Sequence, residues 1–318
     1  MIIRNKTITI FGGTGFLGHY VVKKLGDLGC KINVVTRDKN KKTELKVGLS
    51  LGQLDIIEGN ILDIDFVESI IAKSDIIINL VGCLFETKTG EFASVHAQFP
   101  ETLAQLATKY NLQQFIHISA LGVDRNNSAR YAATKLAGEK AVKENFSNHV
   151  ILRPSVIFGY EDNFINQFAD LSTLSPIMPL IIGGKTKFQP VYVNDVAESI
   201  AKIVQTDKFN ANIYEMGGPN IYTLRQMIEM ILKTLDRKRL MLNIPYRLSS
   251  LLGNVLGKLP KPLLTGDQVK LLTTDNVTQP NALTLYDLAI QPKSLDEILP
   301  EILVRHKNLS YHIPTCTN

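Results

Sequence analysis

The stretch ITIFGGTGFLG, residues 8–18, decides the fold of this chain. A short apolar run leads into three glycines spaced G-x-x-G-x-x-G, and a helical pattern begins at Phe16. Gly12 permits a tight turn, Gly15 lets a diphosphate approach the backbone, and Gly18 lets the helix pack closely on the strand. Because free N–H groups and the helix dipole favour an anion at such a turn, the stretch predicts a dinucleotide site rather than a glycine-rich turn without a ligand. The residues expected to hold the cofactor are Gly12, Gly13, Thr14, Gly15, Phe16, Leu17 and Gly18.

Outward from this stretch, short runs rich in Ile and Val alternate with helical patterns, which is typical of a parallel sheet covered on both faces. Strands are expected at Thr7–Phe11, Lys31–Thr36, Leu54–Glu58, Asp75–Val81, Gln114–Ser119 and Val150–Arg153. The helices expected between them include Phe16–Leu25, Pro100–Lys109 and Ala129–Asn145. The pattern predicts an α/β fold in which residues 1–158 form a Rossmann-type doubly wound parallel sheet.

Residues 159–318 are expected to form a smaller C-terminal region on the substrate or partner side. Helical patterns occupy Glu161–Leu171, Asp195–Gln205 and Thr223–Leu235, and short strands are expected at Val191–Val193 and Ile213–Met216. Asn194 and Thr223 are placed to cap the second and third of these helices. From Leu240 the chain is apolar and rich in loops, so this region is predicted to be a small, loop-rich subdomain.

The composition is that of an ordinary globular protein, with 45% hydrophobic and 20% charged residues in 318. A formal net charge of +5 is too small to indicate a nucleic-acid partner. Cys30, Cys83 and Cys316 lack the spacing of metal ligands, so no metal site is expected and the thiols are expected to be buried and reduced. The first expected strand starts at Thr7, which leaves no room for a signal peptide, and no apolar run approaches the roughly 20 residues of a membrane span. These features predict a cytoplasmic protein.

The residues after the second strand bear on the choice of cofactor. Arg37 directly follows this strand, where a cation can pair with the 2′-phosphate of NADP(H). Asp38 lies twenty residues after Gly18, where an acid can accept a hydrogen bond from the 2′-hydroxyl of NAD(H) instead. The glycine spacing resembles that of extended and atypical short-chain dehydrogenases, and this resemblance implies NADP(H), because many members with Arg directly after this strand use it. NADP(H) is therefore the preferred cofactor, and NAD(H) remains the alternative.

Two further segments match positions where Rossmann proteins touch the cofactor. Asn60 and Ile61 follow the third strand, where an amide can hydrogen-bond the adenine edge. Leu80, Val81 and Gly82 follow the fourth strand, where a small residue lets the backbone approach a ribose. Each segment alone is also compatible with an ordinary turn. Both gain weight because doubly wound sheets bind their ligands at the carboxyl ends of strands.

A possible catalytic trio follows the glycine turn at the distance expected for a short-chain dehydrogenase. Ser119 ends the fifth strand, and Tyr131 and Lys135 are spaced Tyr-x-x-x-Lys on one face of the next helix. A neighbouring ammonium is expected to favour the phenolate of Tyr131 for proton transfer, while Lys135 binds the nicotinamide ribose and Ser119 orients a substrate oxygen. Only twelve positions separate Ser119 from Tyr131, fewer than in typical extended enzymes. Cofactor contact by Lys135 is therefore a firmer prediction than turnover, and a surface Tyr and Lys are the alternative.

Four longer stretches after Ser119 indicate which family the chain resembles. Residues 131–140 read YAATKLAGEK, residues 151–159 read ILRPSVIFG, residues 161–169 read EDNFINQFA and residues 189–196 read QPVYVNDV. Together with the glycine turn, they resemble the NAD(P)H-binding accessory subunit family of respiratory complex I (NADH:ubiquinone oxidoreductase), an atypical branch of the short-chain dehydrogenases. The resemblance covers essentially the whole chain and implies a tightly held NADPH, with Pro154 and Ile157 beside the nicotinamide. It also implies a structural or assembly role among the subunits of a membrane respiratory complex, and without a transit peptide a bacterial member is expected.

Residues 237–266 contain six basic residues and no acidic ones. Apolar residues recur there at helical spacing, at Leu248, Leu251, Leu252, Val255, Leu256 and Leu259. A helix of this kind can lie on an anionic membrane surface, which would place the protein on the inner face of the cell membrane. A core-facing helix of the C-terminal region explains the same leucines equally well.

Two functions from different classes remain open. The resemblance favours a structural, assembly or accessory subunit. Retention of Tyr131 and Lys135 favours an active NADPH-dependent oxidoreductase or epimerase, acting on a quinone-related or isoprenoid substrate. The apolar basic segment fits both, because a lipid-soluble substrate also requires approach to the membrane.

Overall fold

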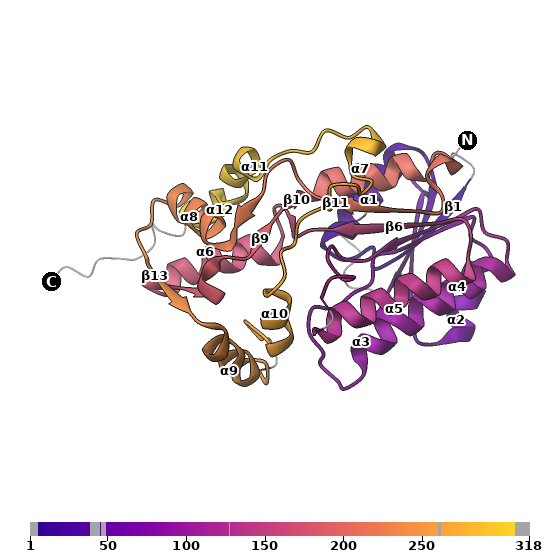
Figure 1. Cartoon of the computed structure of the whole chain (residues 1–318). Coiled ribbons are helices and arrows are strands. Elements are labelled where there is room, and N and C mark those ends of the chain that lie inside the picture. The colour runs from indigo at the N-terminus through magenta and orange to yellow at the C-terminus, as the bar shows by residue number, and fades with distance from the viewer. Residues whose placement is uncertain (1–5, 39–44, 46–48, 127, 260–261, 309–318) are drawn as a thin grey trace.

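The computed structural model describes residues 6–38, 45, 49–126, 128–259 and 262–308. Its centre is a seven-stranded parallel sheet with the order β11-β6-β5-β4-β1-β2-β3 (Figure 1). The strands are β1 (Thr7–Phe11), β2 (Lys31–Thr36), β3 (Leu54–Glu58), β4 (Ile76–Asn79), β5 (Gln114–Ile118), β6 (His149–Pro154) and β11 (Asn212–Met216). The first three strands are confirmed at both ends, and the next three agree to within two residues.

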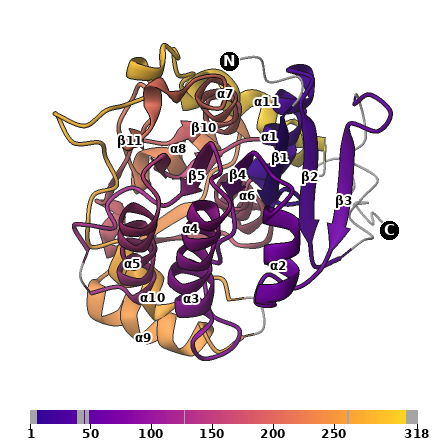
Figure 2. The same ribbon diagram turned by 90° about the vertical axis from the view of Figure 1, so that its right-hand side faces the viewer.

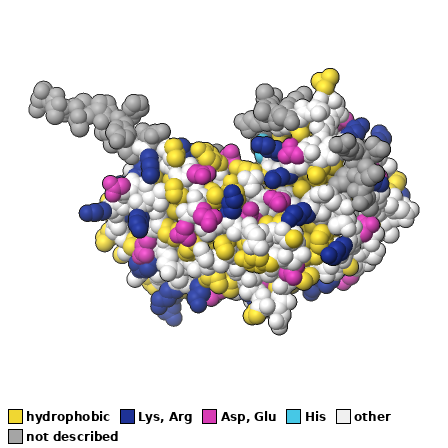
Figure 3. Space-filling view, turned by 90° about the horizontal axis from the view of Figure 1, so that it is seen from above, with side chains coloured by type: hydrophobic (Ala, Val, Ile, Leu, Met, Phe, Trp, Pro, Cys, Tyr) yellow, Lys and Arg dark blue, Asp and Glu magenta, His cyan; other side chains and the backbone are white. Residues whose placement is uncertain are grey.

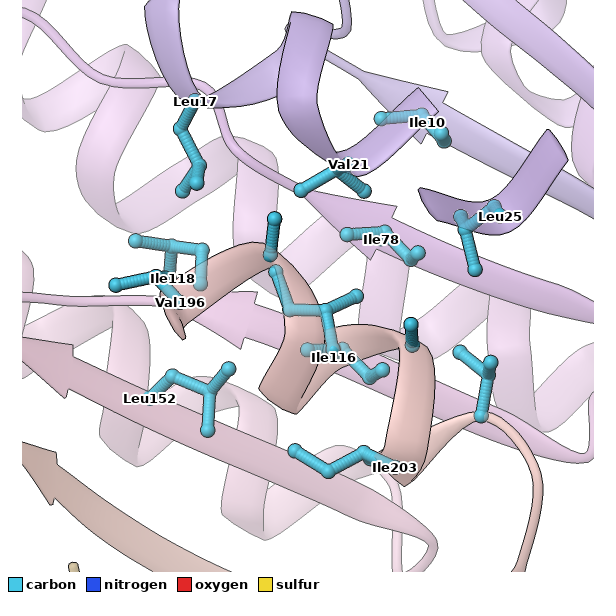
Figure 4. Close-up of a cluster of buried hydrophobic side chains, with 14 of the residues drawn as sticks. Ile10, Leu17, Val21, Leu25, Ile78, Ile116, Ile118, Leu152, Val196 and Ile203 are labelled. Atoms are coloured by element: carbon cyan, nitrogen blue, oxygen red, sulfur yellow. The ribbon is translucent and has the colours of Figure 1, made fainter. Parts of the chain in front are cut away.

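Helices cover both faces of this sheet (Figure 2). On one face lie α1 (Phe16–Asp27) and α7 (Val193–Ile203), and on the other lie α2 (Ile64–Ile71), α4 (Phe99–Lys109) and α5 (Arg130–Asn145). Side chains of the middle strands pack against α1 and α7, as Figure 4 shows for Ile10, Ile78 and Ile116. Burial on two faces explains why these strands read as continuous Ile and Val runs rather than as alternating patterns.

A second hydrophobic core holds the C-terminal half together. It is built by α6 (Asn163–Leu174), β8 (Ile177–Ile181), α8 (Leu224–Thr234) and α11 (Leu295–Ile302). Thr223 caps α8 by accepting from the Gln226 N–H, which confirms that prediction. The predicted division at residue 158 does not separate the two halves completely. Two elements that follow it, α7 and β11, belong to the Rossmann half.

Beyond Leu240 the chain is more regular than its sequence suggests. Strand β13 (Leu240–Ile244) pairs in parallel with β8, and α9 (Tyr246–Leu256) packs on α10 (Gly266–Leu271). The remaining elements are β7 (Ile157–Phe158), β9 (Lys187–Phe188), β10 (Val191–Tyr192), β12 (Tyr222–Thr223), α3 (Glu91–Ala93), α12 (Val304–Asn308), the π-helix Ser94–Gln98 and the 3-10 turns Ile182–Gly184, Asp207–Phe209 and Tyr286–Leu288. Among the described residues, no helix combines the length and apolarity needed to cross a bilayer.

The predicted cap of α7 is wrong. Its N-cap is Tyr192, and the buried Val193 already belongs to the helix, so Asn194 lies inside the first turn. There the Asn194 amide donates to the Tyr192 hydroxyl at 2.8 Å. The helix starts directly after β10 because Val193 anchors it in the core, which leaves no position for a polar capping residue.

The two cysteines among the described residues differ in burial. Cys30 is buried and Cys83 is half-buried, both as free thiols, while Cys316 lies outside the described residues. On the face shown in Figure 3, Lys and Arg side chains are interspersed with Asp and Glu over the described residues.

Candidate functional site

The predicted cofactor residues meet at the carboxyl edge of the central sheet. The chain builds β1, β2 and β3 outward in one direction and β4, β5 and β6 in the other. Such a reversal opens a crevice at the carboxyl ends of the two central strands, where doubly wound sheets bind ligands. The predicted residues at the carboxyl ends of the six strands β1 to β6 are Gly12–Gly18, Arg37, Asn60, Ile61, Leu80–Gly82, Ser119 and Pro154.

The glycine turn between β1 and α1 leaves a cradle at the helix N-terminus. Gly12 has φ +84°, and a Cβ built on it would lie 3.1 Å from the Leu80 carbonyl carbon and the Val81 nitrogen. Gly15 is the N-cap of α1 and supplies no side chain to cover the first-turn N–H groups. A Cβ on Gly18 would lie 2.4 Å from the Gly13 carbonyl oxygen, so only glycine allows this helix to pack so closely. Open N–H groups in a cradle free of Cβ atoms fit a diphosphate.

The end of β2 is linked to the glycine turn. The hydroxyls of Thr14 and Thr36 lie 3.4 Å apart, and the Asp38 N–H donates to Thr36 Oγ1 at 3.2 Å. Arg37 and Asp38 are both exposed. Hydrogen bonds from Thr87 lower the pKa of Glu91, and the Arg37 charge adds a smaller effect in the same direction.

In the turn after β3, the amide oxygen of Asn60 is already engaged in a local hydrogen bond. Asn60 is exposed, and its amide oxygen accepts from the Leu62 N–H at 3.0 Å. The contact with adenine predicted for Asn60 would therefore come from its amide nitrogen. Ile61 is half-buried against the core beneath α2 and α4. A Cβ on Gly59 would lie 2.0 Å from the Phe66 ring, which explains the glycine at this turn.

The end of β4 brings its backbone close to the predicted lysine. The Val81 N–H donates to Asn79 Oδ1 at 3.0 Å, and this fixes the direction in which the chain leaves the strand. A Cβ on Gly82 would lie 3.3 Å from Lys135 Nζ, so glycine here leaves room for the ammonium group. Leu80 and Val81 are half-buried at the same edge.

Lys135 is a buried cation on α5. Its side chain donates from Nζ to the Ile118 carbonyl oxygen at 3.0 Å, and the residue is only 3% exposed. Burial lowers the pKa of Lys135 to about 8, against smaller opposing effects of Cys83 and Glu139. The ammonium form therefore predominates at neutral pH, and it donates hydrogen bonds at the edge where a nicotinamide ribose is predicted.

Tyr131 does not have the expected electrostatics. Its ring lies 5.2 Å from the His96 ring and 5.9 Å from the Phe92 ring, both edge-on. Burial raises the pKa of Tyr131 above its ordinary value of 10.0, and Cys83 adds to this rise. The expectation that Lys135 favours the phenolate is therefore wrong for this arrangement, because desolvation of the phenol is the dominant effect. Tyr131 keeps its proton at neutral pH and is a hydrogen-bond donor.

His96 is a site residue that the sequence alone did not reveal. It lies on the π-helix Ser94–Gln98, is fully buried, and its Nε2 accepts from the Cys83 N–H at 3.1 Å. Its Nδ1 lies 3.3 Å from Thr134 Oγ1. Burial, helped by the Lys135 charge, lowers the pKa of His96 to about 3, so the ring is neutral and its proton is assigned to Nδ1. His96 thereby joins the segment after β4 to α5.

Ser119 and Pro154 lie on neighbouring strands β5 and β6. Ser119 is 3% exposed, and its hydroxyl finds no hydrogen-bond partner among the described residues. A buried hydroxyl without a partner fits a position where a ligand oxygen is bound. Pro154 is buried at the end of β6, and Ile157 is half-buried on β7 three residues later.

A buried charge cluster holds α5 against β6. Arg153 donates to both carboxylate oxygens of Glu139 at 2.9 and 2.7 Å and to Asp124 at 2.6 Å. Glu215 of β11 lies 3.7 Å away, and both glutamates are buried. The cluster therefore fixes the helix that carries Lys135 to the strand that carries Pro154, and no local sequence pattern indicates it.

Comparisons with known proteins agree with this geometry. Residues 8–217 match the NAD dependent epimerase/dehydratase family. Over 313 residues the chain is 31% identical to the NADH-ubiquinone oxidoreductase 40 kDa subunit, mitochondrial, of Neurospora crassa, which covers 98% of this chain and 82% of that protein. It is 33% identical over 301 residues to NADH dehydrogenase [ubiquinone] 1 alpha subcomplex subunit 9, mitochondrial, of Rattus norvegicus, covering 94% of this chain and 80% of that protein. This chain belongs to the complex I accessory-subunit branch of the NAD dependent epimerase/dehydratase family.

Solved structures of an epimerase and of an NADPH-dependent oxidoreductase share the fold. A UDP-glucose 4-epimerase of Thermotoga maritima has a TM-score of 0.71 at 19% identity and covers 96% of this chain and 100% of that chain. An NADPH-dependent quinone oxidoreductase of Escherichia coli, complexed with NADPH, has a TM-score of 0.73 at 16% identity and covers 93% of this chain and 99% of that chain. At these identities the likeness concerns the fold alone. Membership of the family makes the crevice a nucleotide-cofactor site, and the roles of its individual residues remain predictions.

This member of the complex I accessory-subunit family also exposes an apolar helix. On α9, Leu251 and Val255 are each 60% exposed and Leu248 is also exposed, as is Leu259 just after the helix. The buried residues of α9 are Ser249 and Gly253, and a Cβ on Gly253 would lie 2.9 Å from the Gly266 nitrogen. Leu252 is half-buried and packs against the cluster that includes Val269 of α10. The leucine repeat is therefore mostly solvent-facing, and the core-facing interpretation is wrong for these four residues.

Proposed function

We propose that this protein is an NADP(H)-holding accessory subunit of a respiratory NADH:ubiquinone oxidoreductase, with a structural or assembly role. The observation that carries the proposal is the extent of similarity. The dehydratase family matches residues 8–217, whereas the relatives named as respiratory-complex subunits match 92–98% of the chain and so include much of the C-terminal region. A region that is shared with these subunits and lies outside the cofactor domain is the part expected to meet partner subunits.

The preferred cofactor is NADP(H), held by the residues gathered at the sheet edge. Gly12, Gly15 and the first turn of α1 take the diphosphate, and the exposed Arg37 guanidinium pairs with the 2′-phosphate. Lys135 binds the nicotinamide ribose, and Pro154 and Ile157 lie beside the ring. When bound, this cofactor supplies a hydride donor, but the raised pKa of Tyr131 argues against a strong general base in the same crevice.

The exposed apolar side of α9 is proposed to face the anionic surface of a membrane, beside the partner subunits. Residues 237–266 carry basic side chains and no acidic ones, which complements anionic lipid headgroups. On α9 and just after it, the exposed Leu251 and Val255 lie near Arg247 and Lys258. This arrangement supports peripheral attachment to the inner face of the cell membrane.

Purification of the native protein tests the main proposal. Comigration with NADH:ubiquinone oxidoreductase activity in mild detergent is the expected result, with NADP(H) released on denaturation. Recovery as a free protein without nucleotide would contradict the proposal. For the surface, Leu251→Ser with Val255→Ser should reduce flotation with anionic vesicles. The matched control is Leu51→Ser, an exposed leucine distant in sequence, which should leave flotation unchanged.

The second candidate is an active NADPH-dependent oxidoreductase or epimerase, favoured by the Ser119 hydroxyl, which has no partner among the described residues, and by the retention of Tyr131 and Lys135. Complementation of a deletion strain by Tyr131→Phe separates the two. An accessory subunit should retain cofactor and restore complex I activity with this variant. An enzyme should lose its cellular function, because removal of acid–base help costs about a hundredfold or more in rate. Normal cofactor content without complementation would therefore favour the enzyme.

A further inference from the structure

The helix that carries Tyr131 and Lys135 begins without a cap of its own. Its N-cap residue is Ala129, whose side chain cannot accept a hydrogen bond from the first-turn N–H groups. Uncapped first-turn N–H groups destabilise a helix end unless another group accepts them. The first turn of α5 is part of the proposed cofactor site, because Tyr131 is its second residue.

A carboxylate from the C-terminal region supplies the missing cap. Asp267, in the first turn of α10, accepts from the Arg130 N–H at 2.8 Å through Oδ1 and from the Tyr131 N–H at 2.9 Å through Oδ2. Both carboxylate oxygens are therefore used at this helix end, where the helix dipole also favours a negative charge. Asp267 is separated from Tyr131 by 136 positions in the chain.

The short connection between Ser119 and Tyr131 also contacts α10 and the residues just after it. Asn126 donates to the Lys270 carbonyl oxygen at 2.9 Å and to Thr274 Oγ1 at 3.1 Å, while its own amide oxygen accepts from the Ala129 N–H at 3.1 Å. In the views of Figures 1 and 2, α10 lies beside the start of α5, in agreement with the contacts between these helices. Through Asn126, the segment that begins with α10 therefore supports this connection.

We propose that Asp267 is a positioning residue for the proposed cofactor site: by capping α5, it holds Tyr131 and Lys135 in place against the nicotinamide half of the cofactor. This inference rests on the proposed NADP(H) function. It also places part of the site outside residues 8–217, the span of the cofactor-domain match. Since α9 packs on α10, Asp267 connects the exposed apolar helix with the cofactor crevice, alongside the contacts that Asn126 makes with α10 and the residues after it.

Two ligands distinguish this role from a general loss of stability. NADPH spans the whole crevice, whereas adenosine 2′,5′-bisphosphate reaches only the part formed by the glycine turn and Arg37. In Asp267→Ala, calorimetry should show NADPH binding weakened by roughly fivefold or more, as expected for the loss of a helix cap. Binding of the bisphosphate should be unchanged. Equal losses for both ligands, or no loss for either, would overturn the proposal.

A rescue variant separates the cap of α5 from any effect on α10 itself. Ala129 has the extended conformation of an N-cap residue, so Ala129→Ser offers a hydroxyl to the same helix end. The double variant Asp267→Ala with Ala129→Ser should recover most of the NADPH affinity. Failure of this rescue in a folded protein would mean that Asp267 does not act through α5. As a matched control, Thr223→Ala removes the cap of α8, outside the crevice, and should change binding of neither ligand.

Hydrogen exchange tests the contact without any ligand. In the wild-type protein, the amides of Arg130 and Tyr131 should be protected from exchange, and in Asp267→Asn they should exchange faster because one acceptor and the charge are lost. Free exchange of both amides in the wild-type protein would refute the cap even if the variants failed to fold. If the wild-type protein bound neither ligand, the proposed cofactor function would fail while the exchange result still decided the contact.

Discussion

Substitution of Lys135 by Met is expected to stabilise the ligand-free protein while abolishing its binding of NADP(H). Burial of the ammonium lowers the pKa of Lys135 from 10.5 to about 8. At about 1.36 kcal/mol for each pKa unit, this shift means that burial of the charged ammonium costs roughly 3 kcal/mol of stability at neutral pH. The Met variant avoids that cost but loses the hydrogen bond to Ile118, worth about 1 kcal/mol. The expected net gain in the free energy of unfolding is therefore about 2 kcal/mol at pH 7.

The pH dependence of this gain follows from the same lowered pKa. Below pH 8, Lys135 is charged in both the folded and the unfolded state, so the wild-type protein bears the full cost of burial. Between pH 8 and 10.5 the unfolded chain binds more protons than the folded protein, so wild-type stability rises with pH. Above this window Lys135 is neutral in both states. The advantage of the Met variant should therefore be constant below pH 8, shrink above it, and become a disadvantage of about 1 kcal/mol by about pH 10.5, where only the lost hydrogen bond to Ile118 still counts.

Urea unfolding of the ligand-free proteins at a series of pH values between 6 and 10.5 measures this effect, with calorimetry of NADPH binding alongside. Lys140→Met is a matched control, because Lys140 is exposed on the same helix. The control should change stability by less than about 0.5 kcal/mol. A Met variant at position 135 that is less stable than wild type at pH 7, or a difference that does not change with pH, would refute the reasoning.

Three further outcomes are expected. Arg37→Ala should weaken NADPH binding by roughly tenfold and leave NADH binding nearly unchanged, because only NADPH carries the 2′-phosphate; equal losses in titrations with the two cofactors would contradict the assignment. Gly15→Val should abolish dinucleotide binding in calorimetry while the protein stays folded, since a Cβ there meets only the Gly12 carbonyl oxygen at 3.3 Å; undiminished binding would mean that the glycine turn is not the site. Arg153→Met should lower the free energy of unfolding in urea by about 3–5 kcal/mol, because buried carboxylates including Glu139 lose their cation, and a loss below 1 kcal/mol would refute this role.

Much of the cofactor domain could be predicted from the sequence because its determinants are local. The bounds of β1 and β2 follow from buried Ile and Val runs, and the glycine spacing after β1 reflects backbone requirements of one turn. The predicted cofactor residues were therefore expected at the carboxyl edge of the sheet, because parallel strands bring their carboxyl ends together. The family resemblance extended the prediction to the C-terminal half and is confirmed by relatives that are 30–33% identical.

The features that the sequence did not predict depend on contacts between distant segments. Strand β13 forms only because β8 lies beside it, and α9 buries Ser249 and Gly253 while Leu251 and Val255 stay exposed. His96 gives no local pattern, because its role comes from the approach of Cys83 and Thr134 in space.

The sequence by itself determined the Rossmann sheet, the glycine cradle and the pairing of Tyr131 with Lys135 on one helix, because each depends on residues within about one helical turn or one strand. Only the tertiary structure decided the charge state of that pair. Burial by surrounding elements raises the pKa of Tyr131 and lowers that of Lys135, and desolvation depends on everything packed around a group rather than on its neighbours in the chain. The cap that Asp267 gives to α5 is of the same kind, since 136 positions separate it from Tyr131.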